Sequence, residues 1–134
     1  RDRSSMRRRE LRKIAVQTLY QIAMAGTDWT KALEHTLNGR PSDAFLENNI
    51  KGVLEHLEAI DRSIEQALTH WSLDRLSKVD HAILRLAVYE LLYAKESPPA
   101  VVINEAVELG KLFGTEKNGK FINRVLGKIA RQEE

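Results

Sequence analysis

The sequence predicts an all-α fold of six or seven helices. Apolar residues recur every three or four positions along most of the 134 residues, which is the spacing of a buried helix face. Only seven glycines and three prolines interrupt the chain, whereas a β-sandwich or barrel needs many turns. With 43% apolar and 30% charged residues, the composition is that of a single globular domain over residues 1–134. Residues 1–5 are expected to form a flexible N-terminal tail.

The first half of the chain divides into three or four predicted helices. The first runs from residue 6 to 25 and ends at Gly26, because glycine favours the conformation that closes a helix. A shorter helix covers residues 29–38. A third apolar face follows residues 45–57, and Asp61 is expected to cap a fresh helix that reaches Trp71. This last region is therefore either one bent helix or two.

The second half contains the most apolar helix, over residues 79–95. Its apolar residues cover more than one side, so we expect it at the centre of the bundle. Pro98 and Pro99 end this helix and start the next one, which Gly114 closes. Residues 115–119 are predicted to form a polar turn before the last helix, whose apolar face begins at Phe121.

The charge is distributed unevenly along the chain. The net charge of +2 combines +5 in residues 1–13, +5 in residues 117–132 and −6 in residues 14–116, with two glutamates at the end. Basic ends suggest an anionic partner, and the acidic middle is suited to a basic one.

Few catalytic or metal-binding arrangements are compatible with this sequence. It has no cysteine, which excludes thiol catalysis and thiolate zinc sites, and it has no glycine-rich phosphate loop, GxSxG or HExxH. The four histidines do not pair at helical spacing and are expected on exposed faces. We therefore expect no enzyme, no cofactor and no metal. The lack of cysteine, of an apolar signal segment and of a membrane-length apolar run points to the cytoplasm.

The arginine-rich start of the first helix is the clearest functional signal. Cations near a helix N-terminus oppose the helix dipole, and only Glu10 offers local compensation. An outside anion such as a nucleic-acid phosphate would resolve this conflict. At 100° per residue, one stripe of the helix holds Arg9, Lys13, Val16 and Tyr20. It combines phosphate attraction with a ring for base stacking. Alternatively, Tyr20 is an edge of the core and the arginines form a solvated end.

A second basic segment surrounds the start of the last helix. Lys117 and Lys120 lie where backbone N–H groups can point toward an anion. Phe121 follows directly and is more often a core residue than a base-stacking one. The two basic segments would form one surface if the fold brought them together.

Several motifs resemble the NusB family over essentially the whole chain. The resemblance is most specific in the C-terminal half and extends to the opening helix. It rests on residues 8–9 (RR), 15–20 (AVQTLY), 79–91 (VDHAILRLAVYEL), 99–109 (PAVVINEAVEL), 113–117 (FGTEK) and 120–123 (KFIN).

This resemblance implies a NusB-like fold of two three-helix bundles and a role in transcription antitermination. Such a factor pairs with NusE, a small-subunit ribosomal protein, and the pair binds the single-stranded boxA element of nascent ribosomal RNA. With NusA and NusG, it helps RNA polymerase to read through terminators. The implied RNA-binding residues are Arg7, Arg8, Arg9, Arg12, Tyr20, Lys117, Lys120 and Phe121, and the implied NusE contacts are Asp80 and His81. Lys13 and Arg124 depart from the family's usual residues, Glu and a small residue, and are added as candidate RNA contacts because each adds positive charge.

Two other functions stay open at this point. The chain could be an RNA-targeting module related to ribosomal RNA methyltransferases, which share this fold. It could also be a self-associating helical bundle, because some NusB-like proteins form homodimers.

Overall fold

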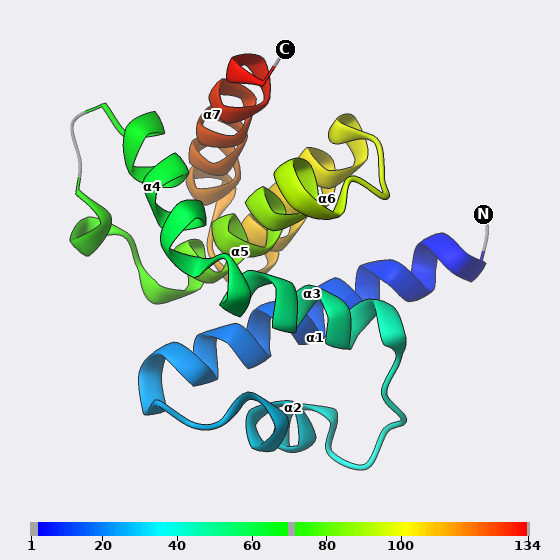
Figure 1. Ribbon diagram of the computed structural model, residues 1–134. Helices are drawn as coiled ribbons and strands as arrows, with labels where there is room; N and C mark the ends of the chain where they lie inside the picture. The colour runs from blue at the N-terminus through cyan, green and yellow to red at the C-terminus, as the bar shows by residue number, and fades with distance from the viewer. Residues whose placement is uncertain (1–2, 70–71, 134) are drawn as a thin grey trace.

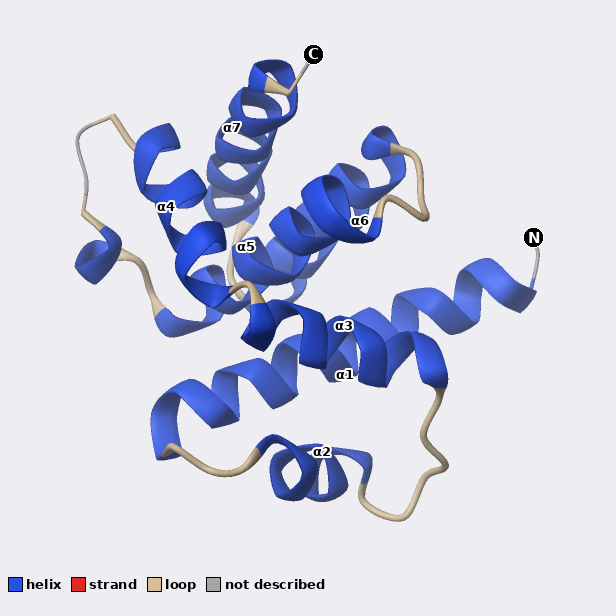
Figure 2. Cartoon of the chain, in the orientation of Figure 1, coloured by secondary structure: helices blue, strands red, loops and turns tan. Residues whose placement is uncertain are grey.

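The computed structural model describes residues 3–69 and 72–133, with side chains from Arg7 onward. Within these ranges the chain is helical with no strand (Figure 2), which confirms the predicted all-α class. The expected tail at residues 1–5 lies partly outside the described residues, and α1 is described from Arg3. The elements are α1 (Arg3–Ala25), α2 (Trp29–Leu37), α3 (Ala44–Glu55), α4 (Leu57–Ala67), the 3-10 turn η1 (Leu73–Arg75), α5 (Lys78–Tyr89), the π-helical turn η2 (Glu90–Ala94), α6 (Pro99–Phe113) and α7 (Glu116–Gln132).

The helices form two packed groups that meet at α5. In the first group α2 and α3 pack against α1, and in the second α4, α6 and α7 surround α5 (Figure 1). Helix α5 also packs against α1 and α3, so it contacts both groups. This confirms the prediction that the most apolar helix is central. Its buried side chains are Ala82, Ile83, Leu84, Leu86, Ala87 and Val88.

The helix ends agree with the sequence in the first half of the chain. Gly26 has a φ of +67° and closes α1 by donating its N–H to the carbonyl of Ile22. Asn38 and Gly39, with φ of 50° and 88°, end α2 in the left-handed region. Glycine and asparagine tolerate this region better than other residues, so the local sequence alone determines where these helices stop.

The predicted break at Asp61 is wrong. The chain bends at His56, between α3 and α4, and Asp61 lies in the interior of α4. There it accepts hydrogen bonds from Arg85 of α5, so its carboxylate serves a tertiary contact rather than a helix cap. Trp71, the predicted end of this segment, lies outside the described residues.

The predicted polar turn at residues 115–119 is also wrong, because α7 already begins at Glu116. Thr115 caps the helix through its hydroxyl, which accepts from the N–H of Lys117, while Asn118 reaches back to the backbone N–H of Thr115. This reciprocal pair allows polar residues to form a first helical turn. Gly114 is required beside it, since a Cβ there would lie 2.4 Å from the Asn118 side-chain oxygen.

The central helix changes geometry at its C-terminal end. It was expected to continue to residue 95, but the α-helix ends at Tyr89 and five π-helical residues follow. Lys95 then adopts a φ of 53° and donates to the carbonyl of Glu90. A π-turn widens the helix by one residue and often occurs at functional sites. Here it begins at Glu90, the buried acid that pairs with α1.

Candidate nucleic-acid interface

The exposed arginines of α1 each contact a carboxylate from another element. Arg7 donates to Asp43, the N-cap of α3, at 2.8 Å. Arg9 holds Glu105 of α6 with two hydrogen bonds of 3.0 and 2.7 Å. These two arginine side chains remain 63% and 64% exposed. The hydrogen bonds and the charge of Glu105 raise the pKa of Arg9 above its usual value.

The sequence argument for an outside anion assumed that these arginines lie uncompensated at a helix N-terminus, and this assumption is wrong. Helix α1 begins at Arg3, so Arg7 and the following arginines lie beyond its first turn. The carboxylates of other helices already compensate their charge. The sequence showed only the local neighbour Glu10, because the compensating acids lie 36 to 96 residues away along the chain.

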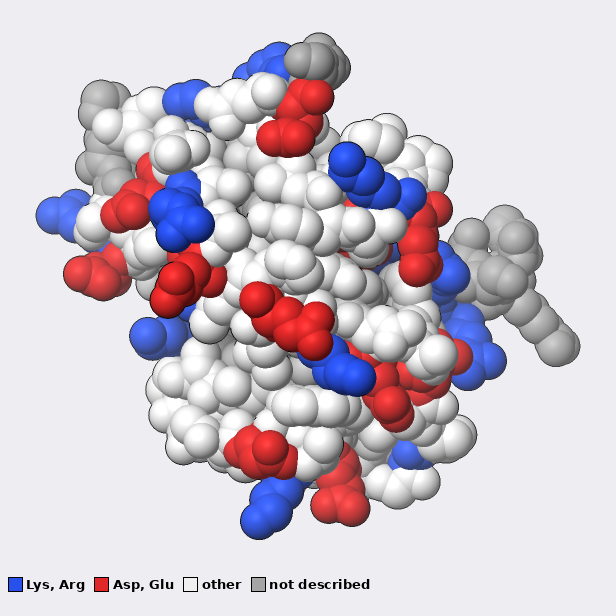
Figure 3. Space-filling view, viewed as in Figure 1, with Lys and Arg blue, Asp and Glu red and all other residues white. Residues whose placement is uncertain are grey.

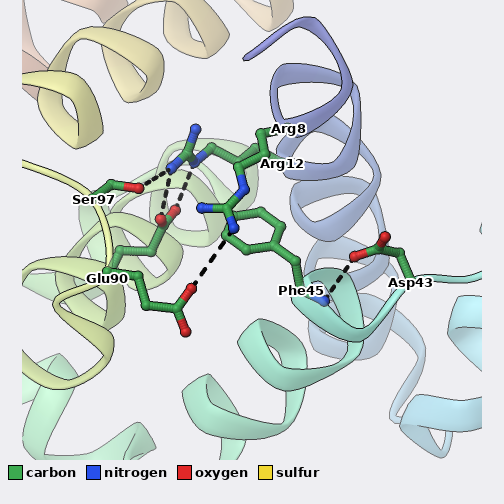
Figure 4. Close-up of polar contacts among 7 residues, drawn as sticks. Arg8, Arg12, Asp43, Phe45, Glu90 and Ser97 are labelled. Carbon is green, nitrogen blue, oxygen red and sulfur yellow. Dashed lines mark hydrogen bonds and ion pairs between the residues drawn. The ribbon is translucent and has the colours of Figure 1, made fainter. Parts of the chain in front are cut away.

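Arg12 is buried rather than displayed. Its guanidinium donates two hydrogen bonds of 2.8 Å to Glu90 and one of 3.2 Å to Ser97 (Figure 4). Only 4% of Arg12 and 3% of Glu90 are exposed. Arg12 belongs to the same helix face as the buried residues Ala15 and Leu19. That spacing, already visible in the sequence, could have indicated that this arginine points inward.

Arg8 lies between the exposed and the buried arginines. Its guanidinium carbon is 4.2 Å from the centre of the Phe45 ring, and its Nη2 is 3.9 Å from a Glu96 oxygen. Arg12 also approaches this ring, at 5.4 Å (Figure 4). Because residues 8 and 12 are one turn apart, they share the face of α1 that meets α3 and η2. Arg8 thus keeps 41% of its side chain exposed while its other side is fixed.

Tyr20 borders an apolar cavity of about 200 Å³. The cavity is lined by Val16 and Gln17 of α1, Val79 of α5 and Phe113 of α6. Tyr20 is 37% exposed, so one part of its ring faces solvent and another faces the cavity. Lys13, on the same predicted stripe, is partly buried, and Val16 is only 1% exposed. The stripe is thus basic at Arg9 and apolar from Val16 onward.

At this cavity α1 lies beside Phe113, which precedes the second basic segment in the chain. Phe113 ends α6, and residues 114–115 lead directly into α7, where Lys117 and Lys120 are exposed. Helix α5 otherwise separates the segments, since α1 packs on α2, α3 and α5, while α7 packs on α6, α5 and α4.

Phe121 and Arg124 lie on another side of α7. They line a cavity of about 130 Å³ together with Leu68 and Thr69 at the end of α4 and Lys128 of α7. The guanidinium carbon of Arg124 is 5.8 Å from the centre of the partly buried Phe121 ring. These two residues therefore extend the basic surface toward α4 rather than toward α1.

Asp80 and His81, the candidate partner contacts, are partly buried and bonded internally. Asp80 accepts from the side-chain amide of Asn118 at 3.0 and 3.2 Å, which ties the start of α5 to the start of α7. Burial raises the pKa of Asp80, although its hydrogen bonds oppose this change. His81 is not the exposed histidine that the sequence suggested, because its Nε2 lies 2.8 Å from a carboxylate oxygen of Asp61.

Asp61 joins this histidine to Arg85. Burial alone would raise the pKa of Asp61, but the hydrogen bonds and charges of His81 and Arg85 hold it below its usual range. The three residues line a polar cavity of about 430 Å³ that also includes Lys78. Sequence reasoning missed this cluster, since its members are 20 and 24 residues apart.

The described residues include no cluster of three or more acids and histidines that could hold a metal ion. None of the helices within the described ranges is long and apolar enough to cross a membrane. His56 is likewise bonded, through Nδ1 to the carbonyl of Gly52, and His35 is exposed, while His70 lies outside the described residues.

Fold and site together define a small all-helical protein that exposes cations on α1 and along α7. Residues 9–131 match the family model described as the NusB family. The chain is 47% identical over 128 residues to the transcription antitermination protein NusB of Exiguobacterium sp.. This alignment covers 96% of this chain and all of the relative. Identity to NusB of Bacillus subtilis is 46%, over 92% of this chain and 95% of that one. This chain belongs to the NusB family.

Solved structures agree with this assignment. T. maritima NusB matches with a TM-score of 0.84 and 40% identity, over 93% of this chain and 91% of that one. A crystal structure of the antitermination factors NusB and NusE in complex with double-stranded RNA matches with a TM-score of 0.85 and 32% identity, over 93% of this chain and 96% of that one. The expected NusB-like fold is therefore confirmed.

Proposed function

We propose that this protein is a non-enzymatic transcription antitermination factor that acts in the cytoplasm and binds RNA together with NusE. The observation that carries the proposal is the row of exposed arginines on α1, in a chain that is similar over nearly its whole length to NusB bound to NusE and RNA. The full-length match to curated antitermination proteins favours this function over a methyltransferase module.

Arg7, Arg8 and Arg9 are the primary phosphate contacts in this proposal. A guanidinium has five N–H donors, and Arg9 uses two of them on Glu105. The remaining donors are available to a phosphate oxygen. Because each arginine already contacts a carboxylate, a phosphate gains less here than at an unpaired arginine. We therefore expect RNA binding by this chain alone to be weak and strongly dependent on salt.

NusE supplies the second half of the RNA surface. Two weak electrostatic surfaces become one selective surface when the proteins associate, so that only RNA touching both is bound tightly. Lys117, Lys120 and Arg124 extend the basic surface on α7, and Phe121 contributes beside them. The cavity beside Tyr20 is large enough to accept part of a base. Asp80 and His81 are proposed to face NusE through the parts of their side chains that internal bonds leave accessible.

Arg12 has a different role in this proposal. Since it is 4% exposed and bonded to Glu90, it positions α1 and does not touch RNA itself.

The proposal is tested by titrating a labelled single-stranded boxA-type RNA at two salt concentrations. The protein is used alone and with NusE, beside a scrambled RNA and a double-stranded form. We expect tighter and sequence-selective binding when NusE is present. Equal binding of all the RNAs, unchanged by NusE, would refute the proposal. Light scattering at two protein concentrations would then show whether the chain instead associates with itself.

Alanine variants of Arg8 and Arg9 test the assigned residues. We expect each to weaken binding of all RNA sequences and to reduce the salt slope by up to about one. Arg62→Ala is the matched control, because Arg62 is an exposed arginine on α4. Salt slopes equal to that of the control would remove α1 from the RNA site.

A further inference from the structure

A groove of about 390 Å³ runs along α3, and its other side is formed by Tyr89, the last residue of α5, by Ala94 of η2 and by Glu96. We call it the α3 groove. Nothing in the proposed RNA contacts uses its central part. The residues that matter for its chemistry are Phe45, Asn49, Gly52, Glu55, Tyr89 and Glu96.

One end of the α3 groove already holds an arginine from the same chain. Arg8 lies over the ring of Phe45 at 4.2 Å and has the Glu96 carboxylate 3.9 Å from its Nη2. An aromatic face combined with a carboxylate is the usual environment for a bound guanidinium or ammonium group. The groove therefore shows, at this end, the kind of side chain that it accommodates.

The other end of the groove again has a carboxylate beside an aromatic ring. Among the described residues that line the groove, Lys51 is the one cation. Glu55 is the exposed last residue of α3, and Ala94 is the last residue of η2. Both helix C-termini carry partial negative charge and carbonyl groups that favour a cation. A band of acidic side chains with a few basic ones crosses this face over α3 and α4 (Figure 3).

Tyr89 forms the aromatic wall at this end of the groove, and the ring of Tyr93 stacks beside it, with 6.1 Å between ring centres. Tyr89 lies directly against Gly52, where a Cβ would come within 2.1 Å of its ring. Tyr93 is 38% exposed and stacks on His56 with 4.1 Å between ring centres. Burial raises the pKa of the Tyr89 hydroxyl, and the charges of Glu55, Glu96 and Glu90 raise it further. Three carboxylates therefore act on this hydroxyl.

The side chain of Asn49 narrows the choice of ligand. It lines the α3 groove, is 4% exposed, and its Nδ2 has no hydrogen-bond partner among the described residues. An unpaired buried N–H group calls for an acceptor. A metal ion or a polyamine offers none, whereas the main-chain carbonyl of a peptide does.

We propose that the α3 groove binds a peptide segment of a partner protein through an arginine or lysine side chain. The cation lies between Glu55 and the rings of Tyr89 and Tyr93, and a main-chain carbonyl of the segment accepts from Asn49. This inference is independent of the RNA site, because it uses the part of the groove beyond Arg8.

A labelled peptide of alternating arginine and glycine tests this proposal by fluorescence anisotropy at low salt, beside a peptide of alternating glutamate and glycine. We expect only the basic peptide to bind. The double variant Glu55→Gln with Tyr93→Ala should weaken it about tenfold, from the loss of one charge contact and one cation–ring contact. Glu58→Gln, at an exposed glutamate in the first turn of α4, is the matched control and should leave binding unchanged.

The side-chain amide resonance of Asn49 provides a second measurement. In a spectrum of nitrogen-15-labelled protein it should shift when the basic peptide is added. Equal weakening by the control variant, no effect of the double variant, or an unmoved Asn49 resonance would overturn the proposal. A shift caused by a short RNA but not by the peptide would also overturn it. Loss of RNA binding in the Arg9→Ala variant, with peptide binding intact, would separate the two sites.

Discussion

Replacing Glu90 by glutamine tests whether Arg12 is held for the fold rather than for RNA. The carboxylate of Glu90 is 3% exposed and accepts two hydrogen bonds from Arg12, which is itself 4% exposed. The variant leaves a buried guanidinium without its counter-charge. Breaking such a pair costs about 3–5 kcal/mol of unfolding free energy. For a chain of this size the Tm should fall by roughly 10–20 °C. Urea unfolding at pH 7, followed by circular dichroism, measures this loss.

Glu105→Gln is the matched control for this prediction. Glu105 also accepts two hydrogen bonds from one arginine of α1, but Arg9 is 64% exposed. Water screens such a pair, so the control should lose no more than about 1 kcal/mol. If Glu90→Gln loses as little as Glu105→Gln, then burial does not distinguish the two pairs. The structural role given to Arg12 would then be refuted.

Three further predictions concern stability. Gly52→Ala should destabilise the protein by about 1–3 kcal/mol or more in urea unfolding, because the new Cβ would overlap the Tyr89 ring. Gly127→Ala is its control: the new Cβ would meet only the flexible end of an arginine side chain, so this variant should be more stable by up to about 1 kcal/mol. In the folded protein the pKa of Asp61 lies below its usual value of about 3.9, so ionised Asp61 adds to the unfolding free energy above about pH 4 and this contribution is lost as the pH falls below 4. The difference in unfolding free energy between the wild type and Asp61→Asn should therefore be smaller at pH 3 than at pH 7. Thr115→Ala should lose about 1 kcal/mol with the capping pair of α7, which thermal unfolding would detect.

The positions of the helices were largely predictable, because each depends on residues close together in the sequence. The apolar spacing located α1, α2, α3, α5 and α6, and the glycines at positions 26 and 39 located two of the ends. The boundaries that failed involve polar residues whose bonding depends on distant partners. Asp61 resembles a cap until Arg85 is seen beside it. The first turn of α7 resembles a loop until the reciprocal bonds of Thr115 and Asn118 are known.

The candidate site was predictable only as a set of residue types. The sequence located the arginines, but it did not show the acids that each one contacts. Those contacts depend on how the fold places Asp43, Glu90 and Glu105 beside α1, which no local pattern encodes. Phe113 was missed as a neighbour of Tyr20 for the same reason, since 93 residues separate them and only the packing of α6 near α1 joins them in one cavity.

The arginines of α1 show why charge counted along the sequence overstates the charge available to RNA. Successive residues on a helix point 100° apart, so Arg7, Arg8 and Arg9 turn in order toward the start of α3, the loop after η2, and α6. Each meets one carboxylate, and Arg12 is neutralised inside the fold. The release of counterions on RNA binding depends on how many phosphates the protein neutralises, and an arginine that must exchange a carboxylate for a phosphate contributes less than an unpaired one. Selectivity can then come from geometry, because only an RNA that contacts several of these arginines together, and NusE with them, compensates the loss of their internal partners.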